Sequence, residues 1–573
     1  GQTIPTKLPP QPAAVVTVTT PPPPVPPTVT TSLPPPATAP LPVTTPPAPP
    51  TPPAPPPLTA TTTTTTAAAA AAGAPKISDS ASTSPPQPDD LTPLMLGKDF
   101  TSAAPNQPLD PLTRDLLARD DFSELNSADP LVDVSRPIAK WLSAGKKIPI
   151  LMLSHNRGSL LRKSIVSLTT TVRGATADNI FIAQDGHDAE CLAIAKEFGI
   201  RSEIHDNPHV SGPPWKVGAV KIARHYKWAF SKLFDHLSTD APAVIVVEDD
   251  LLYAPDFLDY FHAVAPLVEV DDTLWAASSW NDNGFDYLVK EPHALYRTGF
   301  FPGLGWLMTR ELWAELQHKW PQEHWDHWLR QHRQHKGREV LFPAMPRVFH
   351  NGVKGTFMDR KTHEKYFARI ATNRDATIKW RVPKAYGGGS DGSQGEIASG
   401  KHMDPWVRAA RNLAYEARIK RLLTSPATRH VSDPGGEIPT LPAGSSVAIW
   451  VNIDVSRDHP NPFKPVGQFF GIWHEAKRGA FRGVHEFWAN GGETHVLLVN
   501  VHPSVKENKP KGVVHSSFAG YLPSGYRALP GNYFQGMPPF PRKASGALQM
   551  GFHGDEVYNP EKEKVAAQRA RRL

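Results

Sequence analysis

Three apolar segments of this sequence end in polar side chains that are capable of chemistry. In chain order, these are Asn156 and Arg157 after 148–153, Asp185 after 179–183, and Glu248, Asp249 and Asp250 after 242–247. Adjacent carboxylates raise one another's pKa values, and a divalent cation among them relieves their repulsion. Mg²⁺ and Mn²⁺ commonly bind one or two carboxylates together with substrate phosphates. The acidic triplet therefore favours a metal site, the alternative being a solvated turn that caps the next helix.

The segments that must position these side chains alternate between strand and helix patterns. Buried strands are predicted over 148–153, 179–183, 242–247 and 274–280, with a shorter strand over 202–205. Helices are predicted over 159–168, 189–198 and 215–237. This alternation indicates an α/β fold with a mixed, mostly parallel sheet. Because ligands bind beyond the carboxyl ends of such strands, the three polar groups are expected to converge at one edge.

Five long blocks between residues 148 and 358 carry a resemblance to a known family. They are KIARHYKWAF from Lys221, VVEDDLLYAPDF from Val246, SSWNDNG from Ser278, LYRTGFFPGLGWLMTRELWAEL from Leu295, and HKWPQEHWDHWLR from His318. In these blocks the chain resembles the inverting β-1,2-N-acetylglucosaminyltransferases. The resemblance implies a GT-A type domain that uses Mn²⁺ and moves N-acetylglucosamine from UDP-N-acetylglucosamine to a terminal α-mannose of a glycoprotein N-glycan. It also implies a place in the Golgi lumen.

The resemblance assigns roles to the polar residues at the strand ends. It implies that Asp250 binds the metal, that Asp249 lies near the ribose and that Glu248 lies near the donor sugar. It also implies nucleotide contacts for Arg157 and His225 and uracil recognition for Asp185. An Asp can accept a hydrogen bond from a uracil N–H, and an Arg can offset diphosphate charge. The alternatives are a helix cap or surface ion pair for Arg157, a turn for Asp185 and a packed ring for His225.

Asp326 is the candidate catalytic base. In an inverting displacement, a carboxylate on the acceptor side removes the proton of the attacking hydroxyl. The family's base precedes x-Trp-Met-Arg, and Asp326 here precedes His327-Trp328-Leu329-Arg330. The family often has an acid where His327 stands. Trp325 and Trp328 flank Asp326 in the sequence, so we expect indole rings around this carboxylate. Such rings predict a modestly raised pKa for Asp326. They also predict a contact between Trp325 and the substrate. Asp326 can equally act as a helix N-cap.

Two further groups of residues invite a functional interpretation. The segment 352–357, with Gly355 and Thr356, resembles the loop that closes over the donor, and glycines permit such movement. A plain loop is the alternative. His324, His327, His332 and His335 invite a zinc interpretation, but no other ligand set accompanies them. Cys191, the single cysteine, excludes an intrachain disulfide, so the disulfides of the family cannot be present.

Composition divides the chain into parts. The 573 residues carry a net charge of +6, too mild for a dedicated nucleic-acid binder. The predicted parts are a disordered Pro/Thr/Ala-rich stem (1–90), a linker with a short helix around 112–117 (91–145), the GT-A domain (146–423), a linker (424–444), a smaller β-rich or α+β domain (445–560) and a charged tail (561–573). Residues 403–423 are predicted to form one basic amphipathic helix. No apolar stretch is long enough for a membrane span, and we expect membrane attachment only through an upstream anchor.

Three other functions remain open at the level of the sequence. The same fold could act on O-mannosyl glycans, or it could use another UDP-sugar. A catalytically idle glycan-binding protein on a glycosylated stalk is the third. The persistence of both the acidic triplet and the candidate base weighs against the last of these.

Overall fold

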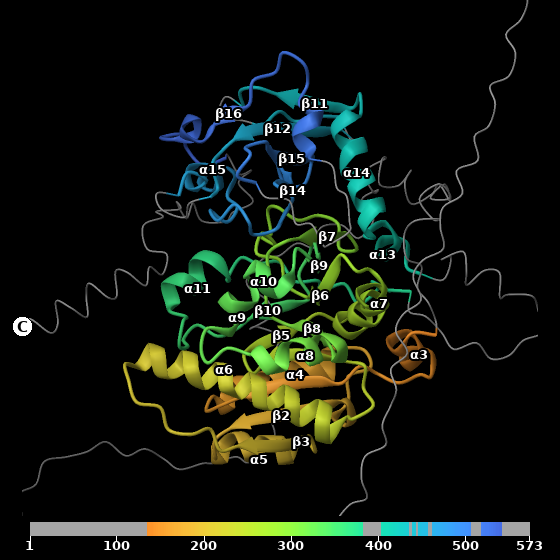
Figure 1. The fold of residues 1–573 in the computed structure, drawn as a ribbon, viewed down its shortest axis with the longest axis vertical. Helices are drawn as coiled ribbons and strands as arrows, with labels where there is room; N and C mark the ends of the chain where they lie inside the picture. The colour runs from red at the N-terminus through yellow and green to blue at the C-terminus, as the bar shows by residue number, and fades with distance from the viewer. Residues whose placement is uncertain are drawn as a thin grey trace, which may run out of the picture. The chain divides into compact units, whose positions relative to one another are not determined.

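The computed structural model describes residues 135–381, 403–434, 438–442, 445–456, 461–505 and 517–540 (Figure 1). The predicted stem, the helix expected around 112–117 and the charged tail lie outside the described residues. Among the residues that are described, no helix combines the length and apolar character that crossing a bilayer requires.

One mixed sheet of eight strands carries the first half of the fold. Its spatial order is β3-β2-β1-β4-β8-β6-β9-β7. The strands are β1 (Ile150–Ser154), β2 (Ile180–Asp185), β3 (Arg201–His205), β4 (Ala243–Glu248), β6 (Leu274–Ser278), β7 (Leu295–Thr298), β8 (Trp306–Thr309) and β9 (Glu339–Pro343). Strands β3, β2, β1 and β4 are mutually parallel, whereas β8 runs antiparallel to both β4 and β6. The expected mixed, mostly parallel sheet is confirmed.

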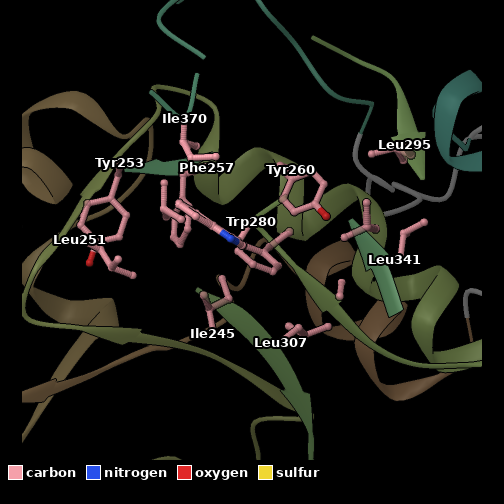
Figure 2. Packing of buried hydrophobic residues seen from close by; sticks show 14 of the residues in the cluster. Ile245, Leu251, Tyr253, Phe257, Tyr260, Trp280, Leu295, Leu307, Leu341 and Ile370 are labelled. Carbon is pink, nitrogen blue, oxygen red and sulfur yellow. The ribbon is translucent and has the colours of Figure 1, made fainter. Parts of the chain in front are cut away.

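Helices cover both faces of this sheet because alternate strand residues point to opposite sides. Ile150 and Met152 of β1 pack with α4 (Gly158–Thr171), α5 (Ala189–Glu197) and α7 (Phe257–Val270). Leu151 and Leu153 pack with α6 (Pro214–Lys232), which continues as one π-helical turn over Leu233–Leu237. Figure 2 shows the first of these cores, where Ile245, Phe257 and Trp280 lie together. Strands buried on both faces explain the continuous apolar runs of the sequence.

Short elements complete this half of the fold. The helices are α3 (Pro137–Ser143), α8 (Arg310–Leu316), α9 (Trp325–Leu329), α10 (His332–His335) and α11 (Arg360–Tyr366), with 3-10 turns at Ala177–Asn179 and Gln317–Lys319. A separate antiparallel ribbon pairs β5 (Leu251–Tyr253) with β10 (Val348–His350). This ribbon brings the segment after the acidic triplet beside residues almost one hundred positions later.

A second sheet lies in the C-terminal part of the chain. It contains β11 (Thr428–Val431), β12 (Ser446–Asn452), β13 (Ala480–Phe481), β14 (Val484–Ala489), β15 (Thr494–Asn500) and β16 (Leu529–Pro530). Helix α15 (Lys464–Phe470) and two 3-10 turns, Phe518–Tyr521 and Gly531–Phe534, accompany it. The predicted linker 424–444 needs correction, because β11 lies inside it and pairs with β12.

The predicted single helix over 403–423 is also wrong. The segment forms two helices, α13 (Pro405–Ala409) and α14 (Asn412–Thr424), separated at an extended Arg411. The backbone groups at this break have partners outside the helix. The carbonyl of Ala410 accepts from Arg297 Nη1 at 3.0 Å, and the N–H of Asn412 donates to Asp271 at 3.2 Å. These tertiary partners replace helical hydrogen bonds and set the bend.

Buried ion pairs join the two sheets. Arg297 on β7 binds Glu339 on β9 at 2.7 Å and Asp271 at 2.9 Å. The other carboxylate oxygen of Glu339 accepts from Arg482, which follows β13, at 3.1 Å. Arg482 also binds Glu416 of α14 at 2.7 Å. This interdomain network, made of Asp271, Arg297, Glu339, Glu416 and Arg482, is almost fully buried.

Candidate active site

The acidic triplet lies at the carboxyl end of β4, as expected. The parallel pairing of β1 with β4 sets Leu153 beside Glu248, so the turn after β1 faces the triplet. Asp249 and Asp250 are only 1% and 3% exposed. Buried carboxylates require partners of opposite charge or hydrogen bonds, so their surroundings define what this site can bind.

Arg157 is the cation that faces these carboxylates. It is the N-cap residue of α4, directly after β1. Its Nη1 donates to Asp250 Oδ2 at 2.7 Å, and its Nη2 donates to Asp249 Oδ1. Burial lowers the pKa of Arg157, but the nearby carboxylates outweigh that effect and raise it above its ordinary value. Arg157 thus occupies the N-cap position of α4 without a side-chain capping bond, and its guanidinium points to the acidic triplet.

One guanidinium does not balance the three carboxylates of the triplet. Burial, followed by the charge of Asp250, raises the pKa of Glu248 to about 7. Burial also raises the pKa of Asp249 to about 6, although Arg157 opposes the shift. The hydroxyl of Tyr226 on α6 donates to Glu248 at 2.6 Å. The site therefore holds excess negative charge at neutral pH, which a cation would neutralise.

The donor atoms in this site fit a divalent cation. Asp249 Oδ2 and Asp250 Oδ1 are buried without a hydrogen-bond partner among the described residues. His350 Nε2 lies 3.7 Å from Asp250 Oδ2. Gly352 passes so close that a Cβ there would overlap Asp250 Oδ2. Hard oxygen donors with unused lone pairs are what Mg²⁺ and Mn²⁺ prefer.

Asp185 forms a second polar group at the neighbouring strand ends. It ends β2, and His205 ends the adjacent β3. One ligand atom from each of Asp185, His205 and His225 lies within 4.8 Å of the others, so the three could hold a metal ion. His225 Nε2 binds the carbonyl of Ala183 at 3.0 Å, and its Nδ1 lies 3.2 Å from His205 Nδ1. Burial lowers the pKa of His225 to about 4, so this ring is neutral at physiological pH.

Asp326 lies in the first turn of α9, and its surroundings differ from the expectation. Its side chain is 34% exposed, and Arg330 Nη1 donates to it at 2.8 Å. Burial would raise the pKa of Asp326, but the charges of Arg330 and His327 outweigh burial and lower it. The predicted raised pKa is therefore wrong, because that prediction did not take into account the charge of Arg330, four residues later. No helix N-cap bond forms either, since the N-cap position belongs to His324.

Trp325 is placed behind the site rather than at an open surface. It is 8% exposed and stacks on Tyr226 with ring centroids 4.1 Å apart. Trp306 and Trp320 stack at 5.9 and 6.2 Å from the same ring. Trp325 thus packs against Tyr226, whose hydroxyl donates to Glu248. Burial mainly raises the pKa of Tyr226, and the nearby charge of Asp326 contributes to the same shift. The aromatic stack links the acidic triplet to the candidate base.

The segment 352–357 borders the same site. Gly355 lies beside Arg157, since a Cβ on Gly355 would be 3.8 Å from Arg157 Nη1. Thr356 packs closely against Gly218 of α6, where a Cβ would overlap the Thr356 side chain. Val353 and Phe357 are the exposed large apolar residues of the described chain, at 44% and 47%. Exposed apolar side chains beside a polar site are suited to covering a ligand.

The structure therefore brings together most of the residues selected from the sequence. Arg157, Glu248, Asp249, Asp250 and Gly355 surround one site, and Asp185 and His225 lie beside each other at the adjacent strand ends. Tyr226, His205 and His350 were missed. His205 could have been found because it ends a predicted strand next to Asp185. His350 has no such signal, since only the β5–β10 pairing brings it close.

A mixed sheet whose parallel strands end at an acidic triplet and a facing arginine defines a GT-A type domain, the class of nucleotide-sugar-binding transferase folds. Residues 126–384 match the sequence model of the GNT-I family. The chain is 38% identical over 298 residues to an α-1,3-mannosyl-glycoprotein 2-β-N-acetylglucosaminyltransferase from Arabidopsis thaliana. The match covers 49% of this chain and 66% of that relative, slightly under two thirds of its length.

Solved structures give more distant likenesses. A mannosyltransferase from Pyrobaculum calidifontis, in complex with GDP-Man and Mn²⁺, matches with a TM-score of 0.23 and 14% identity, covering 41% of this chain and 68% of that one. TarS from S. aureus matches with a TM-score of 0.25 and 8% identity, covering 35% and 59%. The fold class rests on the sheet itself and on the family match, not on these scores.

Proposed function

We propose that this protein is an inverting glycosyltransferase that moves N-acetylglucosamine from UDP-N-acetylglucosamine, in β-1,2 linkage, to a terminal α-mannose of a glycoprotein N-glycan. The observation that carries the proposal is the pairing of an intact acidic triplet with a separate carboxylate, Asp326, across the Tyr226–Trp325 stack. The separate carboxylate can act as the base of an inverting displacement, and the triplet can hold a cation that offsets diphosphate charge. The relative from Arabidopsis thaliana supports the choice of sugar and acceptor through its name. We further propose a Golgi location.

Each half of the site has a role in the proposed reaction. Asp185 recognises the uracil, His225 contacts the nucleotide, and Arg157 offsets diphosphate charge. Asp249 lies by the ribose and Glu248 by the donor sugar. Asp250 holds the Mn²⁺, which supplies charge stabilisation for the departing diphosphate when bound. Residues 352–357, with Gly355 and Thr356, cover the donor and exclude water.

Asp326 performs the proton transfer. The acceptor hydroxyl oxygen bonds to the anomeric carbon as the bond from that carbon to the UDP oxygen breaks. Asp326 takes the hydroxyl proton, and the electron pair of the broken bond leaves with UDP. Arg330 orients the carboxylate through its 2.8 Å hydrogen bond. Because its pKa is lowered, Asp326 is ionised and ready to accept the proton at neutral pH.

A product analysis tests this proposal. The protein is incubated with Mn²⁺, a panel of UDP-sugars, and acceptors that end in mannose, either as N-glycans or as O-mannosyl peptides. We expect N-acetylglucosamine on the 2-hydroxyl of the N-glycan mannose, with β configuration. Preference for O-mannosyl peptides or for another UDP-sugar would replace the acceptor or the donor. Glycan binding without turnover of any UDP-sugar would favour a binding protein.

A further inference from the structure

Asp185, His205 and His225 come from three elements that meet at one edge of the sheet. Asp185 ends β2, His205 lies opposite it at the end of the parallel β3, and His225 lies on α6, which packs on both strands (Figure 1). One carboxylate oxygen and two ring nitrogens, one atom from each residue, lie within 4.8 Å of one another. The proposed function uses Asp185 and His225 for the nucleotide but gives His205 no role.

The ring of His225 turns an unprotonated nitrogen toward His205. Its Nε2 lies 3.0 Å from the carbonyl oxygen of Ala183, which can only accept, so Nε2 carries the proton of the neutral ring. Burial lowers the pKa of His225 to about 4, so the ring is neutral at physiological pH. Its Nδ1 therefore keeps a free lone pair. Metal-ligating histidines usually have this arrangement, in which the other ring nitrogen donates to a carbonyl or a carboxylate.

The spacing of the two rings suits a shared ion. His205 Nδ1 lies 3.2 Å from His225 Nδ1. This contact is a hydrogen bond when His205 carries its proton on Nδ1. In the other tautomer two lone pairs face each other, and a cation between them turns that repulsion into binding. Zinc–nitrogen distances of about 2.0–2.1 Å in a tetrahedral site place two nitrogens roughly 3.4 Å apart, close to the spacing observed.

Other side chains hold the three ligands in place. The indole of Trp228 stacks on the rings of His205 and His225, with centroids 4.8 and 5.9 Å away. Nδ2 of Asn207 donates to Asp185 Oδ2 at 3.2 Å. Side chains that are fixed before binding lose little conformational freedom when an ion arrives, so this cluster is prepared for one.

We propose that Asp185, His205 and His225 form a Zn²⁺ site that is separate from the cation site of the acidic triplet. Two imidazoles and one carboxylate are a ligand set that Zn²⁺ takes in proteins, with the fourth position open to water. At a given site with nitrogen ligands Zn²⁺ binds more tightly than Mn²⁺, whereas the carboxylate oxygens of the triplet suit Mn²⁺. The two sites therefore prefer different ions.

Zinc in this site inhibits the enzyme. This consequence rests on the proposed function, which assigns Asp185 to the uracil and His225 to a nucleotide contact. An ion that occupies the carboxylate of Asp185 and the Nδ1 of His225 excludes those contacts. Zn²⁺ thus competes with the donor, while Mn²⁺ at Asp250 supports donor binding.

Zinc binding to the full chain tests the site without an assay of activity. Zn²⁺ is titrated by calorimetry in the presence of excess Mn²⁺, and X-ray absorption at the zinc edge reports the number of imidazole ligands. We expect two imidazoles on the ion in the unaltered protein and in Asp250→Asn. His205→Phe and His225→Gln should each remove one imidazole and weaken Zn²⁺ binding at least about tenfold, since loss of even an outer partner of a ligand costs 10–100-fold.

The variants are chosen to separate ligand loss from misfolding. His205→Phe keeps an aromatic ring for the stack with Trp228 and removes both nitrogens. His187→Leu is the matched control, because His187 also follows β2 and pairs at 2.6 Å with Asp206, which follows β3. That pair is exposed and lies outside the cluster, so its loss should leave the Zn²⁺ affinity unchanged.

A second titration tests the overlap with the nucleotide. Uridine is used because it has the uracil but no phosphate that could bind a metal. We expect uridine to bind the zinc-free protein and to lower the apparent Zn²⁺ affinity as its concentration rises.

The outcomes separate this inference from the function on which it rests. Equal Zn²⁺ affinity in the unaltered protein, His205→Phe and His225→Gln overturns the site and leaves the proposed function intact. Zinc binding that is lost only in Asp250→Asn places the ion at the acidic triplet and also overturns it, as does an equal loss in His187→Leu and His205→Phe. Uridine that binds without competing overturns the inhibition. If uridine does not bind at all, the uracil role in the proposed function is wrong and the inhibition falls with it, while the zinc site stands on its variants.

Discussion

The carboxylate of Asp326 accepts a hydrogen bond from the guanidinium of Arg330, one helical turn later, with 2.8 Å between Nη1 and Oδ2. Arg330 is itself fixed by the carbonyl of Phe301 at 3.0 Å and lies over the Phe300 ring. The pair therefore holds the candidate base in one orientation. It also stabilises the ionised carboxylate, which makes Asp326 a weaker but permanently available proton acceptor.

Asp326→Asn should abolish most of the turnover while preserving donor binding. The amide keeps the size of the carboxylate and can still accept from Arg330, but it cannot take a proton. General-base loss costs about 10²–10⁴-fold in rate, so we expect a fall in kcat of that order. The Kd for UDP, measured by calorimetry, should change little. Glu323→Gln provides the control, and a large loss of turnover there, with normal turnover in Asp326→Asn, would make Glu323 the base.

Arg330→Met should move the acidic limb of the pH–rate profile to higher pH. The charge of Arg330 opposes the effect of burial and lowers the pKa of Asp326, so its removal raises that pKa. The base works only when ionised, and activity falls as pH drops through its pKa. Arg330→Lys keeps a positive charge and should shift the limb less. Profiles of kcat that coincide for all three proteins would show that Asp326 does not set the limb.

Gly352→Ala should impair the donor site without unfolding the protein. A Cβ at this position would overlap Asp250 Oδ2, whereas a Cβ on Gly520 would meet nothing within 4 Å. The Asp250 side chain must therefore shift in Gly352→Ala, and we expect weaker Mn²⁺ and UDP binding by at least about tenfold. Gly520→Ala is the control, and circular dichroism reports the fold of both. Unchanged Mn²⁺ affinity in Gly352→Ala would contradict the placement of the ion at Asp250.

Arg157→Ala should make the stability of the protein depend more strongly on metal. The variant leaves Asp249 and Asp250 without their guanidinium, so the repulsion among the triplet is no longer offset. We expect a lower Tm in chelator and a larger rise in Tm on adding Mn²⁺ than the unaltered protein shows. Arg162→Ala, which loses an exposed pair with Glu197, is the comparison. Equal Mn²⁺-induced shifts in Arg157→Ala and in the unaltered protein would argue against a shared site.

The sequence predicted the parallel half of the sheet well because each of those strands is a continuous apolar run between helices. Strands β1, β2 and β4 lie within two residues of their predicted bounds. The polar residues after them converge because parallel strands end at a common edge. Strands β7 to β10 were not predicted individually. A short apolar segment such as 340–342 has the same sequence pattern whether its strand runs parallel or antiparallel to its neighbours.

Features that depend on tertiary contacts could not be predicted from the sequence. The break at Arg411 arises from hydrogen bonds to Arg297 and Asp271, more than one hundred residues away. The lowered pKa of Asp326 depends on the orientation of Arg330, which spacing alone does not give. His350 reaches the acidic triplet only through strand pairing.

The interdomain network limits how this protein can be shortened for recombinant production. The family match ends at residue 384, which invites a fragment that stops there. Such a fragment would lack Arg482, leaving a buried oxygen of Glu339 without its cation, and would remove the Ala410 carbonyl from Arg297. Removing one partner of a buried ion pair costs about 3–5 kcal/mol, a large share of the stability of a typical domain. The shortest fragment expected to fold on its own therefore extends beyond residue 482, well past the residues that match the family model.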